Sequence, residues 1–214
     1  MKTVTTTYNL YSFNELAPDV QQKIIERERQ YLLEDPDKTD IFSDMIETEY
    51  KEEFPHSELS VQYSLCYCQG DGLNTYGTVT IEDMKKHIII NPVLLQFFNE
   101  IDFTYFYLPE NRTLYSYSYA DRFDLIQAIE IDNQHDIETI IENSTFYNNK
   151  NMILEELENL NDQICSFWTI FNEHWERKGY NFFYVITDED VLEFIEANMG
   201  LDVECFTEDG QYYI

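Results

Sequence analysis

The chain has 214 residues, of which 42 are Asp or Glu and only 13 are Lys or Arg, so its formal net charge at pH 7 is −29. This charge excludes direct binding to nucleic acid or to an anionic lipid surface, because both recruit Lys and Arg to phosphate groups. Disordered chains usually combine high charge with few aromatic residues, but aromatics make up 16% of this chain, so we expect it to fold. A basic protein surface, or bound cations, is the natural counterpart of the charge.

The N-terminal part is predicted to contain a strand over residues 3–10 and then two helices. Pro18 can open the first helix, and an apolar stripe continues to about Leu33. The second helix is predicted from Asp40 to Phe54, where Pro55 ends it.

A β-hairpin is predicted next. Apolar and polar residues alternate from Leu59 to Tyr67, which is typical of a strand. A second strand is predicted over 75–81. The turn between them contains two glycines able to adopt positive φ and consists of Gln69, Gly70, Asp71 and Gly72.

The middle of the chain is rich in aromatic residues. The pattern predicts a helix over 93–101, strands over 103–108 and 113–119, and a further strand over 123–131.

The C-terminal part is dominated by a long helix. Apolar residues recur at helical spacing from Ile153 to Trp175, and Gly179 is placed as the C-cap. A short strand over 182–186 should follow. Asp188 is then expected to cap a helix that reaches about residue 198, and a closing hairpin is predicted around residues 208–210.

These elements predict one α+β domain over residues 1–214, with a mostly antiparallel sheet, several helices and one long C-terminal helix. The pattern also allows an inserted aromatic β-hairpin region at 83–132.

Three stretches of the chain form a recognisable pattern: Tyr-Ser-Phe-Asn-Glu-Leu at 11–16, Tyr-Ser-Leu-Cys-Tyr-Cys-Gln-Gly-Asp-Gly at 63–72, and Glu-Ala-Asn followed by Phe-Thr-Glu-Asp-Gly within 196–210. Their order resembles that of a family of small acidic proteins from bacteriophages and other mobile elements. The resemblance implies a phage-like, cytosolic origin and no particular activity. Members often carry Ser or Thr where Ala17 precedes the first helix, and the lost cap weakens the helix by about 1 kcal/mol.

The sequence predicts neither a cofactor nor catalysis. The turn at 69–72 lacks the Gly-Lys-Ser/Thr ending of a phosphate-binding loop, and a hairpin turn in which Asp71 bonds the backbone is favoured over a calcium loop. No nucleophile motif is present, and the cysteines and histidines lack zinc-site spacing. A metal-dependent enzyme remains a third alternative. No signal peptide or membrane span is visible, so we expect a cytoplasmic protein with no membrane association and with reduced thiols at Cys66, Cys68, Cys165 and Cys205.

Two acidic tracts suggest a mode of binding. Residues 26–58 contain 12 acids and 4 bases, and residues 179–214 contain 9 acids and no Lys or Arg. Rows of carboxylates on helices can approximate the charge spacing of duplex DNA, about one charge per 1.7 Å. The predicted partner-binding acids are Asp44, Glu47, Glu49, Glu52, Glu53, Asp188, Asp190 and Glu193.

Two functional hypotheses follow. The first is a phage-encoded inhibitor of anti-CRISPR or anti-restriction type, a DNA mimic that binds a basic, nucleic-acid-binding nuclease or effector complex of the host. The alternative is a non-enzymatic regulatory or antitoxin-like module whose interface is aromatic. The candidate aromatic cluster lacks the basic groove of single-strand binders, which favours core packing or a protein-interface patch; it consists of Tyr105, Phe106, Tyr107, Tyr115, Tyr117 and Tyr119.

Overall fold

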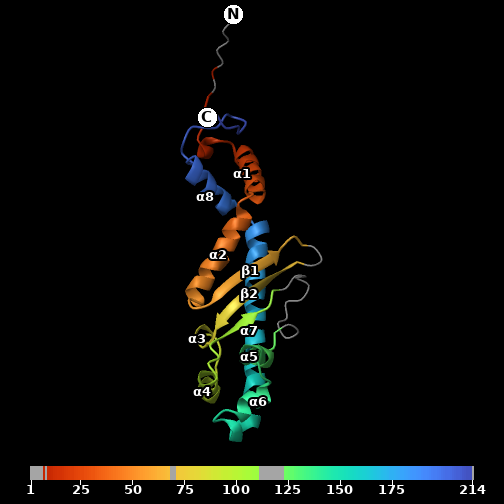
Figure 1. The fold of residues 1–214 in the computed structure, drawn as a ribbon. Coiled ribbons are helices and arrows are strands. Elements are labelled where there is room, and N and C mark those ends of the chain that lie inside the picture. The colour runs from red at the N-terminus through yellow and green to blue at the C-terminus, as the bar shows by residue number, and fades with distance from the viewer. Residues whose placement is uncertain (1–6, 8, 68–70, 111–122, 214) are drawn as a thin grey trace, which may run out of the picture. The chain divides into compact units, whose positions relative to one another are not determined.

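The computed structural model of the chain describes residues 7, 9–67, 71–110 and 123–213. The fold is α+β, as predicted, with a three-stranded antiparallel sheet, several helices and one long helix (Figure 1). Two compact units are present: unit 1 contains Met1–Lys38 and Tyr180–Ile214, and unit 2 contains Thr39–Gly179. The assignment of residues 1–214 to one domain stays a prediction.

Unit 1 is built around two helices, α1 (Pro18–Leu33) and α8 (Asp188–Asn198). A 3-10 turn, η1 (Phe13–Glu15), precedes α1. The buried apolar faces of the helices meet the C-terminal segment in one core, formed by Phe13, Leu16, Ile24, Ile25, Val191, Ile195 and Phe206. The first helix was predicted with these bounds, and Ala17 is its N-cap without a side-chain hydrogen bond, as expected.

The sheet of unit 2 has the strand order β1-β2-β3. The strands are β1 (Glu58–Ser64), β2 (Gly72–Thr80) and β3 (Tyr105–Leu108), and both neighbouring pairs are antiparallel. The register places Val61 opposite Thr75 and Val79 opposite Phe106. The predicted hairpin and the predicted strand over 103–108 are thereby confirmed.

Helix α7 (Lys150–Tyr184) is the long helix, and α2 (Lys38–Glu53) packs against its unit 2 portion. Two fully buried tryptophans of α7 anchor this packing. The ring of Trp168 lies 5.0 Å from the ring of Phe54, and the ring of Trp175 lies 5.8 Å from that of Phe42. The sheet joins the same core where the Thr75 hydroxyl donates a 2.6 Å hydrogen bond to the side-chain oxygen of Asn172.

Short helical segments complete unit 2: α3 (Ile81–Met84), α4 (Pro92–Glu100), α5 (Leu125–Asn133), α6 (Ile137–Glu142) and η3 (Tyr147–Asn149). Helix α4 confirms the helix predicted over 93–101. The strand predicted over 123–131 is wrong, because this segment forms α5. Leu125 and Ile129, one helical turn apart, are fully buried, and this i, i+4 spacing favours a helix on the core.

The predicted C-terminal boundary of α7 is also wrong. The helix continues through Gly179 to Tyr184 and replaces the strand predicted over 182–186. Gly179 is buried, and a Cβ added there would lie 2.3 Å from Leu65 and 2.8 Å from Phe42. The glycine therefore permits close packing instead of ending the helix. The helix end is stabilised by Lys38, whose ammonium donates to the carbonyl oxygens of Phe182 and Phe183.

Three local predictions need smaller corrections. The strand predicted from Leu59 to Tyr67 ends at Ser64, because Tyr67 has a left-handed backbone with φ of 53°. Thr187, rather than Asp188, is the N-cap of α8. The closing hairpin is a single bridge between Phe206 and Tyr212 among the described residues.

Two predicted strands fall largely outside the described residues. Of the strand over 3–10, residues 7, 9 and 10 are described and form no strand. The strand over 113–119, with its three tyrosines, lies outside the described part of the chain. The predicted inserted hairpin at 83–132 therefore stays a prediction, and its first strand, β3, pairs with β2.

Candidate functional site

Helix α2 presents five of the predicted partner-binding acids. Phe42, Ile46 and Tyr50 form its buried face. The opposite side faces solvent because the helical period separates the two faces. Four of the acids are exposed and Glu49 is half-buried; the exposed ones are Asp44, Glu47, Glu52 and Glu53.

Three of the five acids on α2 lie beside a basic side chain. The closest nitrogen–oxygen distances are 3.8 Å for Glu47 and Lys51, 3.5 Å for Glu49 and Lys178, and 3.9 Å for Glu53 and His87. Ion pairs this open to water contribute little stability. Asp44 and Glu52 have neither an ion pair nor a hydrogen bond to any described residue, so the fold makes no visible use of them.

Helix α8 uses two of its three predicted acids within unit 1. Asp188 forms an ion pair with Arg29. Asp190 and Thr187 form a capping box, in which the Thr187 N–H donates to the Asp190 carboxylate at 2.7 Å. Hydrogen bonds from Thr187 hold the pKa of Asp190 below its usual value. Glu193 is exposed and is the one predicted acid of α8 with no partner among the described residues.

The structure assigns the predicted acids to different units, α2 to unit 2 and α8 to unit 1. Helix α7 also carries exposed acids that the sequence-based choice omitted, among them Glu155, Glu158 and Asp162. Their spacing of three and four residues aligns them on one helix face. That spacing was readable from the sequence once the long helix had been recognised.

The hairpin turn is held by a buried carboxylate. Asp71 accepts a 2.8 Å hydrogen bond from the Cys66 N–H and a 3.1 Å bond from the Ser64 hydroxyl. Gly72 begins β2, whereas Gln69 and Gly70 lie outside the described residues. The geometry of Asp71 agrees with a carboxylate that organises the turn.

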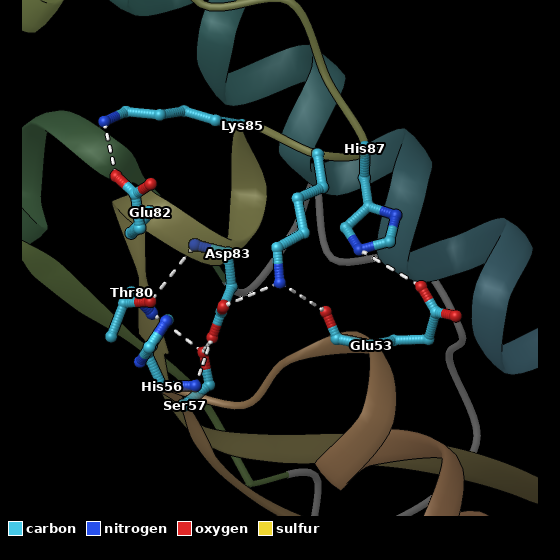
Figure 2. Close-up of polar contacts among 9 residues, drawn as sticks. Glu53, His56, Ser57, Thr80, Glu82, Asp83, Lys85 and His87 are labelled. Atoms are coloured by element: carbon cyan, nitrogen blue, oxygen red, sulfur yellow. Dashed lines mark hydrogen bonds and ion pairs between the residues drawn. The ribbon is translucent and has the colours of Figure 1, made fainter.

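A second buried carboxylate, missed at the sequence level, joins the end of α2 to α3 (Figure 2). Asp83 accepts hydrogen bonds from the His56 N–H at 2.9 Å and from the Ser57 hydroxyl at 2.7 Å. Lys86 lies 3.4 Å from the other carboxylate oxygen. The Asp83 N–H donates in turn to the Thr80 hydroxyl at 3.2 Å.

This arrangement around Asp83 is structural. Burial by itself raises the pKa of Asp83, but the hydrogen bonds from Ser57 and His56, with those of Thr80 and Lys86, outweigh it and lower the pKa. The carboxylate is fully buried and both of its oxygens are engaged by donors of the fold, which keeps it away from a ligand in solvent. Isolated Asp residues of this kind carry no sequence signature, because their partners come from separate segments.

A concave site of different character lies between β3 and α5. Its volume is about 330 Å³. Buried Phe103, Phe106 and Phe123 lie at its floor, exposed Tyr105 and Tyr107 flank it, and Gln127, Asp124 and Asp132 contribute polar groups. We call these residues the aromatic pocket. It contains the three aromatic residues of the predicted interface that the structure describes.

Metal-ligating side chains and thiols are distributed over the described residues, and two of the three described cysteines, Cys165 and Cys205, are at least partly buried. Within residues 7, 9–67, 71–110 and 123–213, no three His, Cys, Asp or Glu side chains are placed to hold a metal ion. Burial raises the pKa of the Cys165 thiol to about 11, with Asp162 and Asp124 adding to the effect, and burial also raises that of Cys205. Such thiols are poor nucleophiles.

No helix in the described part of the chain has both the length and the apolar character that a membrane-spanning helix requires.

Comparison of the chain with protein-family models, with curated proteins and with solved structures found no match. The resemblance to the phage and mobile-element family therefore stays a prediction.

Proposed function

We propose that this protein is a phage- or mobile-element-encoded inhibitor that acts in the host cytoplasm by occupying the nucleic-acid-binding surface of a basic defence protein. An anti-CRISPR or anti-restriction role is its concrete form. The observation that carries the proposal is the outward face of α2, where Asp44 and Glu52 have no partner among the described residues and Glu47 has only an exposed lysine nearby.

The spacing of these acids supports mimicry of charge rather than of detailed shape. A helix rises about 1.5 Å per residue, so Asp44, Glu47 and Glu52 lie roughly 4.5 and 7.5 Å apart along the axis. Each DNA strand carries one charge per about 3.4 Å. The row on α2 is thus sparser than a DNA strand but has the same sign and an extended form, which suits steering toward a basic groove.

Net charge supplies a second line of support. A net charge of −29 is several times the magnitude of about 2 to 8 that solubility requires. Self-repulsion of this size opposes compact folding, so an excess of unpaired acids is best explained by a partner that uses them. Binding should then be fast and should weaken steeply as salt is added.

The test is affinity capture from a host lysate that contains nucleic-acid-handling defence systems, followed by binding measurements with each purified partner. Support requires a basic nucleic-acid-binding protein that is released by moderate salt and displaced by duplex DNA. The α2 variant Asp44→Lys/Glu47→Lys/Glu52→Lys should lose at least tenfold in affinity. A matched variant on α7, Glu155→Lys/Glu158→Lys/Asp162→Lys, carries the same charge change and should lose less. Equal losses would assign the effect to net charge and count against the α2 face.

The second candidate function is a regulatory or antitoxin-like module with an aromatic interface. The exposure of Tyr105 and Tyr107 beside the aromatic pocket favours it. Its complex would persist in high salt, would ignore competing DNA and would be lost in Tyr105→Ala/Tyr107→Ala while the α2 variant still bound.

A further inference from the structure

The aromatic pocket is built on a firm apolar floor. Phe103, Phe106 and Phe123 are each at least nine-tenths buried, and the rings of Phe106 and Phe123 lie 5.1 Å apart. Phe106 belongs to β3, whose register with β2 is fixed by four residue pairs. The floor is therefore part of the core of unit 2, and a ligand would meet a preformed surface.

Two tyrosines of β3 also line the pocket. Residues of β3 alternate in burial, so that Phe106 and Leu108 point inward while Tyr105 and Tyr107 are 51% and 56% exposed. Aromatic side chains left open beside a concave site are typical of binding surfaces, because their burial by a partner releases much apolar area. Their π faces also attract cations.

Two carboxylates give the pocket its charge. Asp124 and Asp132, at the two ends of α5, both line it. Asp124 uses one oxygen to cap α5 by accepting from the Gln127 N–H at 3.1 Å. Asp132 is exposed and has no partner among the described residues. The described lining contains neither Lys nor Arg.

We propose that the aromatic pocket binds an arginine side chain of the basic partner protein. The planar guanidinium would stack on the aromatic rings and form hydrogen bonds with the carboxylate of Asp132, while Asp124, about 12 Å away along the helix axis, would add negative charge. This inference rests on the proposed function only in taking the partner to be basic, since it makes no use of the acids on α2.

Chemistry favours arginine over the other candidates. A guanidinium both stacks on aromatic faces and forks onto carboxylates, whereas a lysine ammonium is a strongly hydrated point charge. A nucleotide is disfavoured, since the two carboxylates would repel its phosphates and stacking sites for single strands combine aromatics with a basic groove. A volume of about 330 Å³ is near the lower end of ligand pockets and suits one side chain rather than a large cofactor.

The experiment is a titration of the full chain with N-acetyl-arginine methylamide, followed by two-dimensional amide NMR. We expect the largest shifts at Tyr105, Tyr107 and Gln127, with a dissociation constant on the order of 1 mM for a ligand of this size. N-acetyl-citrulline methylamide has nearly the same shape without the charge and should bind at least tenfold more weakly. Equal binding of the two ligands would overturn the proposal, as would shifts that spare the pocket.

Variants separate the pocket from general attraction to an acidic protein. Asp132→Asn should weaken binding of the arginine ligand at least threefold, and Tyr107→Ala should weaken it similarly. Glu155→Gln removes the same charge from α7, outside the pocket lining, and should leave binding unchanged. The amide spectrum of each variant reports whether it is folded. Equal loss in Glu155→Gln and Asp132→Asn would show attraction by net charge alone and would refute a specific site.

Other occupants of the pocket give distinct results. Shifts at the pocket that grow with protein concentration and without any ligand would assign it to a second copy of the chain. If the arginine ligand bound only after residues 111–122 had been replaced by a Gly-Ser linker, the occupant of the pocket would be this segment of the same chain. Either result would overturn the proposal. If the arginine ligand binds the pocket and no basic partner is captured, the proposed function fails while the pocket's specificity stands.

Discussion

Helices α8 and α2 were both predicted to present acids to a partner, and the structure uses their acids differently. On α8, Asp188 pairs with Arg29 and Asp190 closes a capping box with Thr187. On α2, Asp44 and Glu52 face solvent with no partner among the described residues. An acidic helix is thus not by itself evidence of a binding face, because a carboxylate near a helix N-terminus often stabilises the helix.

The paired acids of α8 and the unpaired acids of α2 should affect the stability of the fold in opposite directions. A carboxylate that accepts hydrogen bonds or an ion pair within the fold stabilises it, whereas an unpaired carboxylate in a chain of net charge −29 opposes folding through repulsion. Acids kept despite this effect are the better candidates for partner contacts. The comparison therefore favours α2 over α8 as the partner-binding helix, and stability measurements on variants of single carboxylates can test this conclusion.

The largest effect is expected at Asp83, the carboxylate most deeply used by the fold. Asp83→Ala removes the acceptor for the His56 N–H and the Ser57 hydroxyl and leaves Lys86 with only the Glu53 carbonyl oxygen, 3.5 Å away. Loss of such a buried charged group should lower the free energy of unfolding by about 3–5 kcal/mol. Urea denaturation measures it, and Glu82→Ala, which removes an exposed acid paired with Lys85, should cost much less.

The same carboxylate predicts a pH dependence. The pKa of Asp83 is lower in the folded state than its ordinary value, so its stabilising effect is complete above the unfolded pKa of about 3.9 and is lost as the pH falls through the folded pKa. The difference in unfolding free energy between the wild type and Asp83→Asn should therefore be constant from pH 7 to about 5 and shrink in more acidic solution. A difference that grew on acidification would contradict the assignment of Asp83 as an ionised acceptor.

Removal of the capping box on α8 should lower the free energy of unfolding by an intermediate amount. Asp190→Ala removes the carboxylate that accepts from the Thr187 N–H and hydroxyl, so unfolding should become easier by about 1 kcal/mol. Glu193→Ala, on the same helix, is the matched control and should change stability by less than about 0.5 kcal/mol. If both variants behaved alike, the contrast between α8 and α2 would lose its basis.

In α1, a substitution can add a capping group instead of removing one. Ala17 is the N-cap of α1 and provides no side-chain acceptor. Ala17→Ser places a hydroxyl where it can accept from the first-turn N–H groups, and it should stabilise the protein by about 0.5–1 kcal/mol. Ala17→Val, which adds bulk without an acceptor, is the control and should give no gain. Thermal unfolding followed by circular dichroism is sufficient to measure both.

The smallest effect, and the one most informative about function, is expected on α2. Asp44→Asn/Glu52→Gln removes two unpaired charges and should leave stability unchanged or raise it by up to about 0.5 kcal/mol. The gain should disappear in 1 M salt, because screening already suppresses the repulsion. A clear loss of stability would show that these acids serve the fold, as those of α8 do, and would weaken the proposed DNA-like face.

Local patterns in the sequence determined most of the helices and strands of this protein. The hairpin of β1 and β2, the helices α1, α2, α4 and α8, and the apolar face of α7 all depend on spacing within a few consecutive residues. Alternation and helical periodicity report such burial directly. The excess of acids, and with it the expectation of a basic partner, also follows from the sequence alone.

The tertiary structure decided the rest, because the deciding contacts join residues far apart in the chain. Gly179 lies within a helix rather than ending it, since Phe42 and Leu65 pack against its α-carbon. Asp83 is structural because its hydrogen-bond donors come from the loop after α2. In the same way, Asp188 is committed to Arg29, 159 residues away, and the floor of the aromatic pocket combines β3 with the start of α5. A sequence specifies which carboxylates exist, but whether each is paired within the fold or open to a partner depends on the folded arrangement that surrounds it.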